Sequence, residues 1–287
     1  MRVLITGAAG RTGIAVMKAL RKKKNDVIIR AFVHRPEQSE IAAAAGADEI
    51  ASGDMEELSG LKKALAGVDR VYHICPAFHP EEDRIGIDFA ELCSDMGTER
   101  FVYHSVLHSI APDLVHHARK LRVEQALTGG SMPYAIIQNG CLMQNLLMSL
   151  NDVKSSGIWR QRFFDGRSTR MNFVDLADVA EAAATVLLDD DHLYATYELC
   201  GPENLSEQDI LSAMSTAFGR EVRSEFIPDE AFIRAMTSSG APANMIDEMI
   251  IMYSHYQKSG FMGCSGTLSR LLGRQPANIG EFFQKNS

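Results

Sequence analysis

The sequence predicts an α/β fold in which helices cover both faces of a parallel sheet. Short apolar segments rich in strand-forming residues alternate with helical patterns through the first half of the chain, and a glycine-rich turn joins the first strand to the first helix. Hydrophobic residues make up 46% of the chain and charged residues 23%, as in an ordinary globular protein. The 287 residues are enough for one large α/β domain or for a domain with a smaller lobe.

The alternation places strands and helices in a regular order in the first half. Strands are expected at 2–6, 27–33, 48–51, 70–74, 100–104 and 134–138, and helices at 14–20, 37–45, 58–65, 81–96 and 116–127. The connections are short, and no internal repeat or low-complexity linker interrupts them. This order is typical of a doubly wound parallel sheet.

The second half is less regular. Helices are expected at 175–188, 206–218 and 229–257, with a short strand at 196–199. Ser206 is a suitable N-cap for the second of these helices. The segment 229–257 is rich in methionine, which fills cores more often than it lines a flexible apolar pocket.

The turn after the first strand carries Gly7, Gly10 and Gly13 at a spacing of three, with Arg11 and Thr12 in the last gap. A helix N-terminus offers unpaired N–H groups and partial positive charge, and glycines let a pyrophosphate approach the backbone. The strand–turn–helix context therefore predicts a dinucleotide site, with an ordinary glycine-rich turn as the alternative. Arg11 is placed either to bind a phosphate or to be a solvated residue at the helix start.

Together with this turn, several later segments resemble the NmrA-like family of atypical short-chain dehydrogenase/reductases. They are 31–36, 52–54, 116–124, 134–145, 171–180, 197–202 and 271–283. The resemblance implies a Rossmann-type NAD(P)-binding domain over 1–150, with contributions from about 171–200. It also implies a smaller, mainly helical substrate-binding lobe over 151–287 that is interleaved with this domain.

The end of the second expected strand bears on the choice of cofactor. His34 and Arg35 stand there, and no acidic residue follows until Glu37. An acid would accept hydrogen bonds from the adenosine ribose, whereas a guanidinium can bind a 2′-phosphate. We therefore expect NADP (NADPH) to be preferred over NAD, with Arg35 as a plain surface charge being the alternative.

The resemblance implies further cofactor contacts at the carboxyl ends of other strands. Asp54 matches a contact on the adenine side, although it could also be the N-cap of the next helix. Cys75 and Pro76 stand where the middle of the cofactor passes the sheet edge. Asn139, after the sixth strand, stands beside the nicotinamide.

Three residues are candidates for catalysis. Ordinary short-chain reductases use Tyr-x-x-x-Lys; here His116 stands at the tyrosine position and Lys120 is retained. Lys120 is expected to hold the nicotinamide ribose or donate a proton, and His116 to donate a proton near neutral pH. Ser105 is expected to bond a substrate oxygen, or else the local backbone. The alternative for Lys120 is an i,i+4 pair with Glu124 on a solvated helix start.

These features favour an NADPH-dependent reductase of a small, apolar carbonyl, enone or quinone. The missing tyrosine leaves open a catalytically silent redox sensor that binds NAD(P) and acts through a protein partner. An isomerase or epimerase that uses the cofactor transiently is a third reading, which the missing tyrosine weakens.

Composition excludes several other classes. A net charge of −8 without a basic stripe argues against nucleic-acid binding, and no apolar stretch approaches the ~18 residues of a membrane span. Five scattered cysteines without C-x-x-C fit a reduced cytoplasm. Nine histidines form no set at metal-ligand spacing, so we expect no metal. A homodimer remains open.

Overall fold

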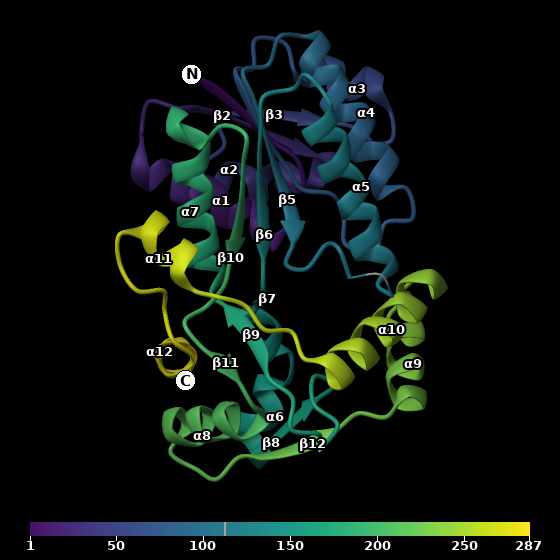
Figure 1. Ribbon diagram of the computed structural model, residues 1–287, viewed down its shortest axis with the longest axis vertical. Coiled ribbons are helices and arrows are strands. Elements are labelled where there is room, and N and C mark those ends of the chain that lie inside the picture. Colours follow the sequence, from purple (N-terminus) through teal and green to yellow (C-terminus); the bar gives the residue numbers. More distant parts are fainter. Residues whose placement is uncertain (112) are drawn as a thin grey trace. The chain divides into compact units, whose positions relative to one another are not determined.

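The computed structural model describes residues 1–111 and 113–287. Its central feature is a seven-stranded sheet with the strand order β10-β6-β5-β4-β1-β2-β3 (Figure 1). The strands are β1 (Arg2–Ile5), β2 (Ile28–Val33), β3 (Glu49–Ser52), β4 (Arg70–His73), β5 (Arg100–Val106), β6 (Tyr134–Asn139) and β10 (Ala195–Leu199). β1 pairs in parallel with β2 and β4, β2 with β3, and β4 with β5. The predicted doubly wound parallel sheet is confirmed.

Helices flank this sheet on both faces. α1 (Arg11–Lys23), α2 (Ser39–Ala44) and α7 (Leu176–Leu188) lie on one side in Figure 1, and α3 (Leu58–Ala64), α4 (Glu82–Asp95) and α5 (Val115–Gly129) on the other. A short 3₁₀ turn, η1 (Pro36–Gln38), precedes α2. On α1, Val16, Met17 and Leu20 are buried at the spacing of three and four residues that gives a helix one apolar face.

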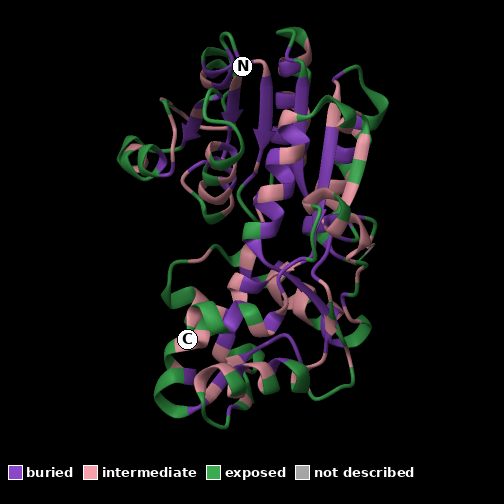
Figure 2. Ribbon diagram, turned by 90° about the vertical axis from the view of Figure 1, so that its left-hand side faces the viewer, coloured by how far each residue is buried: buried purple, intermediate pink, exposed green. Residues whose placement is uncertain are grey.

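The core of the sheet is apolar because its strands are covered on both faces. Val3, Leu4 and Ile5 of β1 have no exposed surface, and Phe101 and Val102 of β5 are equally buried. Figure 2 shows the buried colour along the central strands of the sheet. Runs of this kind lack the alternation of half-exposed strands. They were therefore recognisable as buried strands in the sequence.

The chain divides into two compact units. The first unit comprises Met1–Ile110, His116–Gln138 and Val179–Tyr197, and the second comprises Ala111–Val115, Asn139–Asp178 and Glu198–Ser287.

Two buried arginines fix the returning segment 179–197 within the first unit. Arg70 of β4 donates to the Leu187 carbonyl at 2.7 Å and to the Asp190 carboxylate at 2.6 Å. Arg100 of β5 donates to the Val186 carbonyl and, at 3.1 Å, to Asp190. These guanidinium groups satisfy carbonyls at the C-terminal end of α7 that have no partner within the helix.

The second unit contains helices and two small sheets, with the order β11-β9-β7 in one and β12-β8 in the other. Its strands are β7 (Cys141–Leu142), β8 (Ile158–Gln161), β9 (Met171–Val174), β11 (Asn204–Leu205) and β12 (Arg223–Phe226). Its helices are η2 (Met143–Ser149), α6 (Leu150–Ser156), α8 (Glu207–Phe218), α9 (Asp229–Ser238), α10 (Ala243–Ser259), α11 (Gly266–Leu272) and α12 (Ile279–Asn286). Ser206 is the N-cap of α8, as predicted, and accepts from the Asp209 amide.

The prediction of one continuous helix over 229–257 is wrong. α9 ends at Ser238 and α10 begins at Ala243. Between them Gly240 has a left-handed φ of +80°, and Pro242 takes the N-cap position of α10. A left-handed glycine ends a helix readily, and proline lacks the N–H that a helix interior requires.

Within the two described stretches, no helix combines the length and the apolar character needed to cross a membrane.

Candidate cofactor and catalytic site

The turn after β1 has a backbone that requires glycine. Gly7 has a left-handed φ of +58°, and the Gly10 amide donates to the Gly7 carbonyl at 2.9 Å. A Cβ on Gly13 would lie 2.5 Å from that same carbonyl oxygen, and a Cβ on Gly7 would lie 3.1 Å from the Ile74 carbonyl oxygen. No larger side chain fits this cradle without moving the backbone.

The start of α1 is arranged to receive an anion. Its N-cap, Gly10, provides no side-chain hydrogen bond, and no acidic residue lies in its first turn. Arg11 is exposed, Thr12 half-buried and Gly13 buried. Amide groups at an uncapped helix start bind phosphate oxygens through their N–H donors and the helix dipole. The residues present therefore fit the pyrophosphate of a dinucleotide.

His34 and Arg35 follow β2 with both side chains exposed. Their backbone amides donate to the Gln38 side-chain oxygen at 3.0 and 3.1 Å, which fixes the turn that carries them. β2 lies between β1 and β3 in the sheet. His34 and Arg35 thus stand at the carboxyl end of β2, the strand that pairs with β1 and so lies next to the glycine turn.

Asp54 follows β3 and is half-buried. Its carboxylate accepts from the Glu56 amide at 2.9 Å, whereas the N-cap of α3 is Glu57. The alternative that Asp54 caps the next helix is therefore wrong. Asp54 instead closes the local turn after β3, because its short side chain reaches the amide two residues ahead.

Cys75 and Pro76 follow β4. Cys75 is buried, and burial, followed by the charge of Glu82, raises the pKa of its thiol. Pro76 is exposed. The strand end before them is tied to β1, because the Thr6 hydroxyl accepts from the Ile74 amide at 2.9 Å and lies 2.9 Å from His73 Nδ1.

Lys120, on α5, is held by a buried acid. Its ammonium pairs with the carboxylate of Glu82 and donates to the His104 carbonyl of β5 at 3.4 Å. Glu82 is the first residue of α4 and has no exposed surface. Glu124, the alternative partner considered for Lys120, instead accepts hydrogen bonds from uncharged side chains.

His116 is also buried, with 6% of its surface exposed. Burial, with smaller contributions from His117, Lys120 and Arg119, lowers the pKa of His116 to about 2. The ring packs 4.7 Å from the Phe78 ring, centroid to centroid. The imidazole is therefore neutral near pH 7. The protonated imidazolium, which would be the proton donor, is not populated at that pH.

Ser105 ends in a buried polar network. Its hydroxyl donates to the Glu124 carboxylate, which also accepts from Ser109 at 2.9 Å and from the Gln138 amide at 2.8 Å. All four residues are buried. A serine hydroxyl has one proton, so Ser105 keeps only acceptor capacity toward a ligand.

Asn139 ends β6 and is buried. Its side-chain amide donates to the Gly140 carbonyl at 2.9 Å, and its Oδ1 has no hydrogen-bond partner among the described residues. Buried polar atoms are usually paired. This oxygen could accept from a carboxamide or hydroxyl donor of a bound ligand.

Glu82 and two residues with left-handed backbone, Phe78 and His108, were not predicted from the sequence. Phe78 and His108 have left-handed φ values of +61° and +56°, which cost non-glycine residues free energy and cluster at functional sites. His108 accepts from His117 Nδ1 at 2.9 Å. The only signal for Glu82 was an acidic helix start, Glu81-Glu82-Asp83, which does not reveal which carboxylate points inward.

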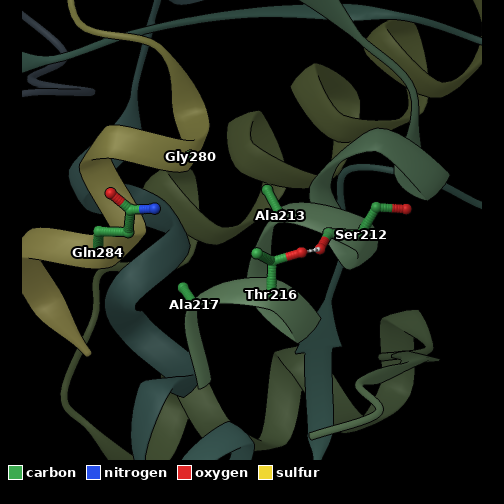
Figure 3. Close-up of a pocket in the computed structure, with 6 residues that line it drawn as sticks. All are labelled: Ser212, Ala213, Thr216, Ala217, Gly280 and Gln284. Atoms are coloured by element: carbon green, nitrogen blue, oxygen red, sulfur yellow. Dashed lines mark hydrogen bonds between the residues drawn. The ribbon is translucent and has the colours of Figure 1, made fainter. Parts of the chain in front are cut away.

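A groove of about 250 Å³ lies between α8 and α12 of the second unit (Figure 3). Its lining consists of Ser212, Ala213, Thr216, Ala217, Gly280 and Gln284. The Thr216 hydroxyl already donates to the Ser212 carbonyl at 2.9 Å.

No group of three or more His, Cys, Asp or Glu residues in the described chain is arranged to hold a metal ion.

Comparisons with known proteins agree with this fold. The sequence model of the NmrA-like family matches residues 1–283. An NAD(P)H azoreductase of Xenophilus azovorans is 27% identical over 286 residues, covering 99% of this chain and 98% of that protein. The solved structure of an NADPH-dependent quinone oxidoreductase from Escherichia coli, complexed with NADPH, has a TM-score of 0.85 and 24% identity, covering 99% of each chain. A Citrobacter triphenylmethane reductase complexed with NADP(H) has a TM-score of 0.83 and 22% identity, covering 100% of this chain and 99% of the other.

Proposed function

This chain belongs to the NmrA-like family, and from that premise we propose that it is an NADPH-dependent reductase of a small apolar quinone, enone or carbonyl compound. The observation that carries the proposal is the glycine turn of residues 7–13 leading into the uncapped start of α1. That arrangement suits a pyrophosphate, because the glycines allow the tight turn and let an anion approach the backbone amides at the start of α1.

The first unit supplies the contacts to the phosphate groups of the cofactor. Amides of Arg11, Thr12 and Gly13 would bind the pyrophosphate, and the exposed side chains of His34 and Arg35 would bind a 2′-phosphate. This favours NADPH over NADH. When bound, the cofactor supplies the hydride.

The contacts and protonation of the three candidate proton donors limit which substrates the site could reduce. His116 is neutral, the Ser105 proton is given to Glu124, and Lys120 is paired with Glu82. An ammonium has three N–H donors, so Lys120 keeps one beyond its two contacts, which suits a ribose hydroxyl. The site is therefore better built to hold the cofactor than to protonate a substrate.

A simple ketone reduced by hydride leaves a localised alkoxide, which needs a nearby acid. A quinone spreads the new charge over its ring and can take its proton from water. A cationic dye becomes neutral on accepting hydride and needs no proton. The structural relatives above are named for a quinone and for triphenylmethane, and a quinone is the acceptor we favour within the proposed class.

Ser105 and Lys120 are already paired with carboxylates, and His116 is neutral. This also supports a second candidate, a regulator that binds NADPH without catalysis. The discriminating experiment has two steps. The purified protein is titrated with NADPH and NADH by fluorescence, and oxidation of bound NADPH is then followed with matched quinones, enones and simple ketones.

Turnover that is fastest with quinones would support the reductase. Tight NADPH binding without turnover by any acceptor would support the regulator. Failure to bind either nucleotide would overturn both candidates.

A further inference from the structure

We infer that Glu82 is a positioning residue for Lys120: its carboxylate holds the ammonium in the place where that ammonium meets the bound nucleotide. The inference rests on the proposed function in one respect, namely that NADPH is the ligand. Nothing in the Tyr-x-x-x-Lys pattern requires an acid at this position.

The first step is the burial of Glu82. Its carboxylate has no exposed surface, and Oε2 has no hydrogen-bond partner among the described residues. Oε1 pairs with Lys120 and accepts from the Tyr103 hydroxyl at 3.4 Å. A carboxylate removed from water is very costly unless an opposite charge compensates it. Lys120 is the cation that does so.

The second step concerns the freedom of Lys120. A lysine ammonium sits on a flexible four-carbon stem, and fixing it on a ligand costs rotamer entropy. Here the side chain is 12% exposed, its ammonium lies 5.6 Å from the centre of the Tyr103 ring, and it also donates to the His104 carbonyl. Glu82 thus fixes the ammonium before any ligand arrives, which lowers the cost of binding.

The third step is the reach of this charge within the first unit. The pKa values of His73 and His104 are both lowered to about 3, mainly by burial and secondly by the charge of Lys120. His73 and His104 are located on β4 and β5. The ammonium held by Glu82 contacts Tyr103 and His104 of β5, and the ring of His73, the last residue of β4, stacks on Tyr103. Glu82 itself begins α4 directly after the loop that contains Cys75 and Phe78.

The test is a double-mutant cycle read by NADPH affinity. Dissociation constants are measured by fluorescence for wild type, Glu82→Gln, Lys120→Met and the double variant. We expect Glu82→Gln to weaken NADPH binding about tenfold, which corresponds to ~1.4 kcal/mol. In the Lys120→Met background the same substitution should change the affinity less than about twofold, because the group that Glu82 positions is gone.

A matched control is the neighbouring residue of α4. Asp83 pairs at 2.8 Å with Arg122, whose side chain is 58% exposed, so Asp83→Asn should leave NADPH affinity unchanged. Lys120→Met leaves the buried Glu82 carboxylate without its cation. If this variant does not fold, the comparison rests on Glu82→Gln and the double variant. Glu82→Gln and the double variant strand no buried carboxylate, and they should then bind NADPH equally weakly.

Two results would overturn the inference while leaving the proposed function intact. One is a Glu82→Gln variant that binds NADPH as tightly as wild type, or more tightly. The other is an equal loss of affinity with and without Lys120, which would mean that Glu82 acts through the fold. A wild-type chain that binds no NADPH would overturn the proposed function and this inference together.

Discussion

The Ser105 hydroxyl donates to the carboxylate of Glu124, nineteen residues further along the chain. Ser109 and Gln138 donate to the same carboxylate, so β5, β6 and α5 meet at one buried acid. A serine in the position expected for substrate binding is therefore part of a structural network. Its contribution to activity and its contribution to stability can be separated by experiment.

We expect Ser105→Ala to lower the free energy of unfolding by about 1–3 kcal/mol, because Glu124 loses one of its donors while remaining buried. NADPH oxidation should fall less than about threefold, since Ser105 has no proton to give a substrate. Urea unfolding and steady-state turnover measure the two effects. A variant of wild-type stability with turnover reduced about 100-fold would contradict this prediction.

Gly13→Ala should distort the cofactor site and weaken it. Its Cβ would lie 2.5 Å from the Gly7 carbonyl oxygen, so the turn must open and the α1 amides must move. Loss of one or two charge-assisted hydrogen bonds predicts NADPH binding weaker by about 10- to 100-fold. Gly129→Ala is the matched control, because a Cβ there meets nothing within 4 Å. Equal affinities of the two variants would show that the turn does not bind the nucleotide.

Arg35→Ala should change selectivity between nucleotides more than it changes affinity for NADH. If the guanidinium binds the 2′-phosphate, NADPH binding weakens about 10- to 100-fold while NADH binding stays constant. Dissociation constants for both nucleotides give the ratio directly. A parallel loss for NADPH and NADH would assign Arg35 to the turn after β2 and not to the phosphate.

Stability should fall as the solution becomes mildly acidic. His73 and His104 have pKa values lowered to about 3, and that of His116 is lowered to about 2, in each case chiefly by burial. An unfolded histidine titrates near pH ~6.5, so below that pH the unfolded chain binds protons that the folded chain excludes. The stabilisation is present above pH ~6.5 and is lost progressively below it, by about 1.4 kcal/mol per pH unit for each histidine.

Urea midpoints measured between pH ~7.5 and ~5 test this slope. His104→Asn, whose side-chain amide keeps a hydrogen-bonding group for the Tyr72 hydroxyl, should reduce the slope by about one third. Exposed His34 provides the control, and His34→Asn should leave the slope unchanged. A flat profile for the wild-type chain would mean that these rings take up protons in the folded state.

One thiol should react in the native protein. Cys264 is exposed, whereas burial raises the pKa values of Cys75, Cys93, Cys141 and Cys200. Thiolates are the reactive form, so iodoacetamide should modify Cys264 alone, as read by intact-mass and peptide analysis. Cys264→Ser should remain unmodified under the same conditions. Rapid labelling at Cys75 would show that the loop after β4 opens.

Much of the first unit could be predicted because its signals are local. The apolar run of β1, the glycine spacing and the helical pattern of α1 follow one another without a break, and each alone indicates its element. The small strands of the second unit could not be found in this way. β7 and β11 have two residues each, and two of the four residues of β8, Arg160 and Gln161, are polar. Their strand conformation depends on partners distant in the sequence.

In the candidate site, too, local features could be predicted and contacts between distant segments could not. Gly7, Gly10 and Gly13 act through backbone geometry that residue type and spacing reveal. The partners of Lys120 and Ser105 do not follow from spacing, because α4 offers several carboxylates and α5 offers Glu124 as well. Glu82, for which no role was predicted, pairs with Lys120, and Glu124 accepts from Ser105 instead, since tertiary packing decides which acid meets the ammonium.

The anchoring of residues 179–197 by Arg70 and Arg100 has a consequence for biosynthesis. Translation delivers the chain from its N-terminus at roughly 5–20 residues per second, so β1 to β6 emerge well before β10 and α7. During that interval both guanidinium groups lack their α7 and Asp190 acceptors, and β6 lacks its neighbour at the sheet edge. The nascent chain therefore carries an unfinished sheet with an open strand edge, the form of folding intermediate that chaperones shield from aggregation.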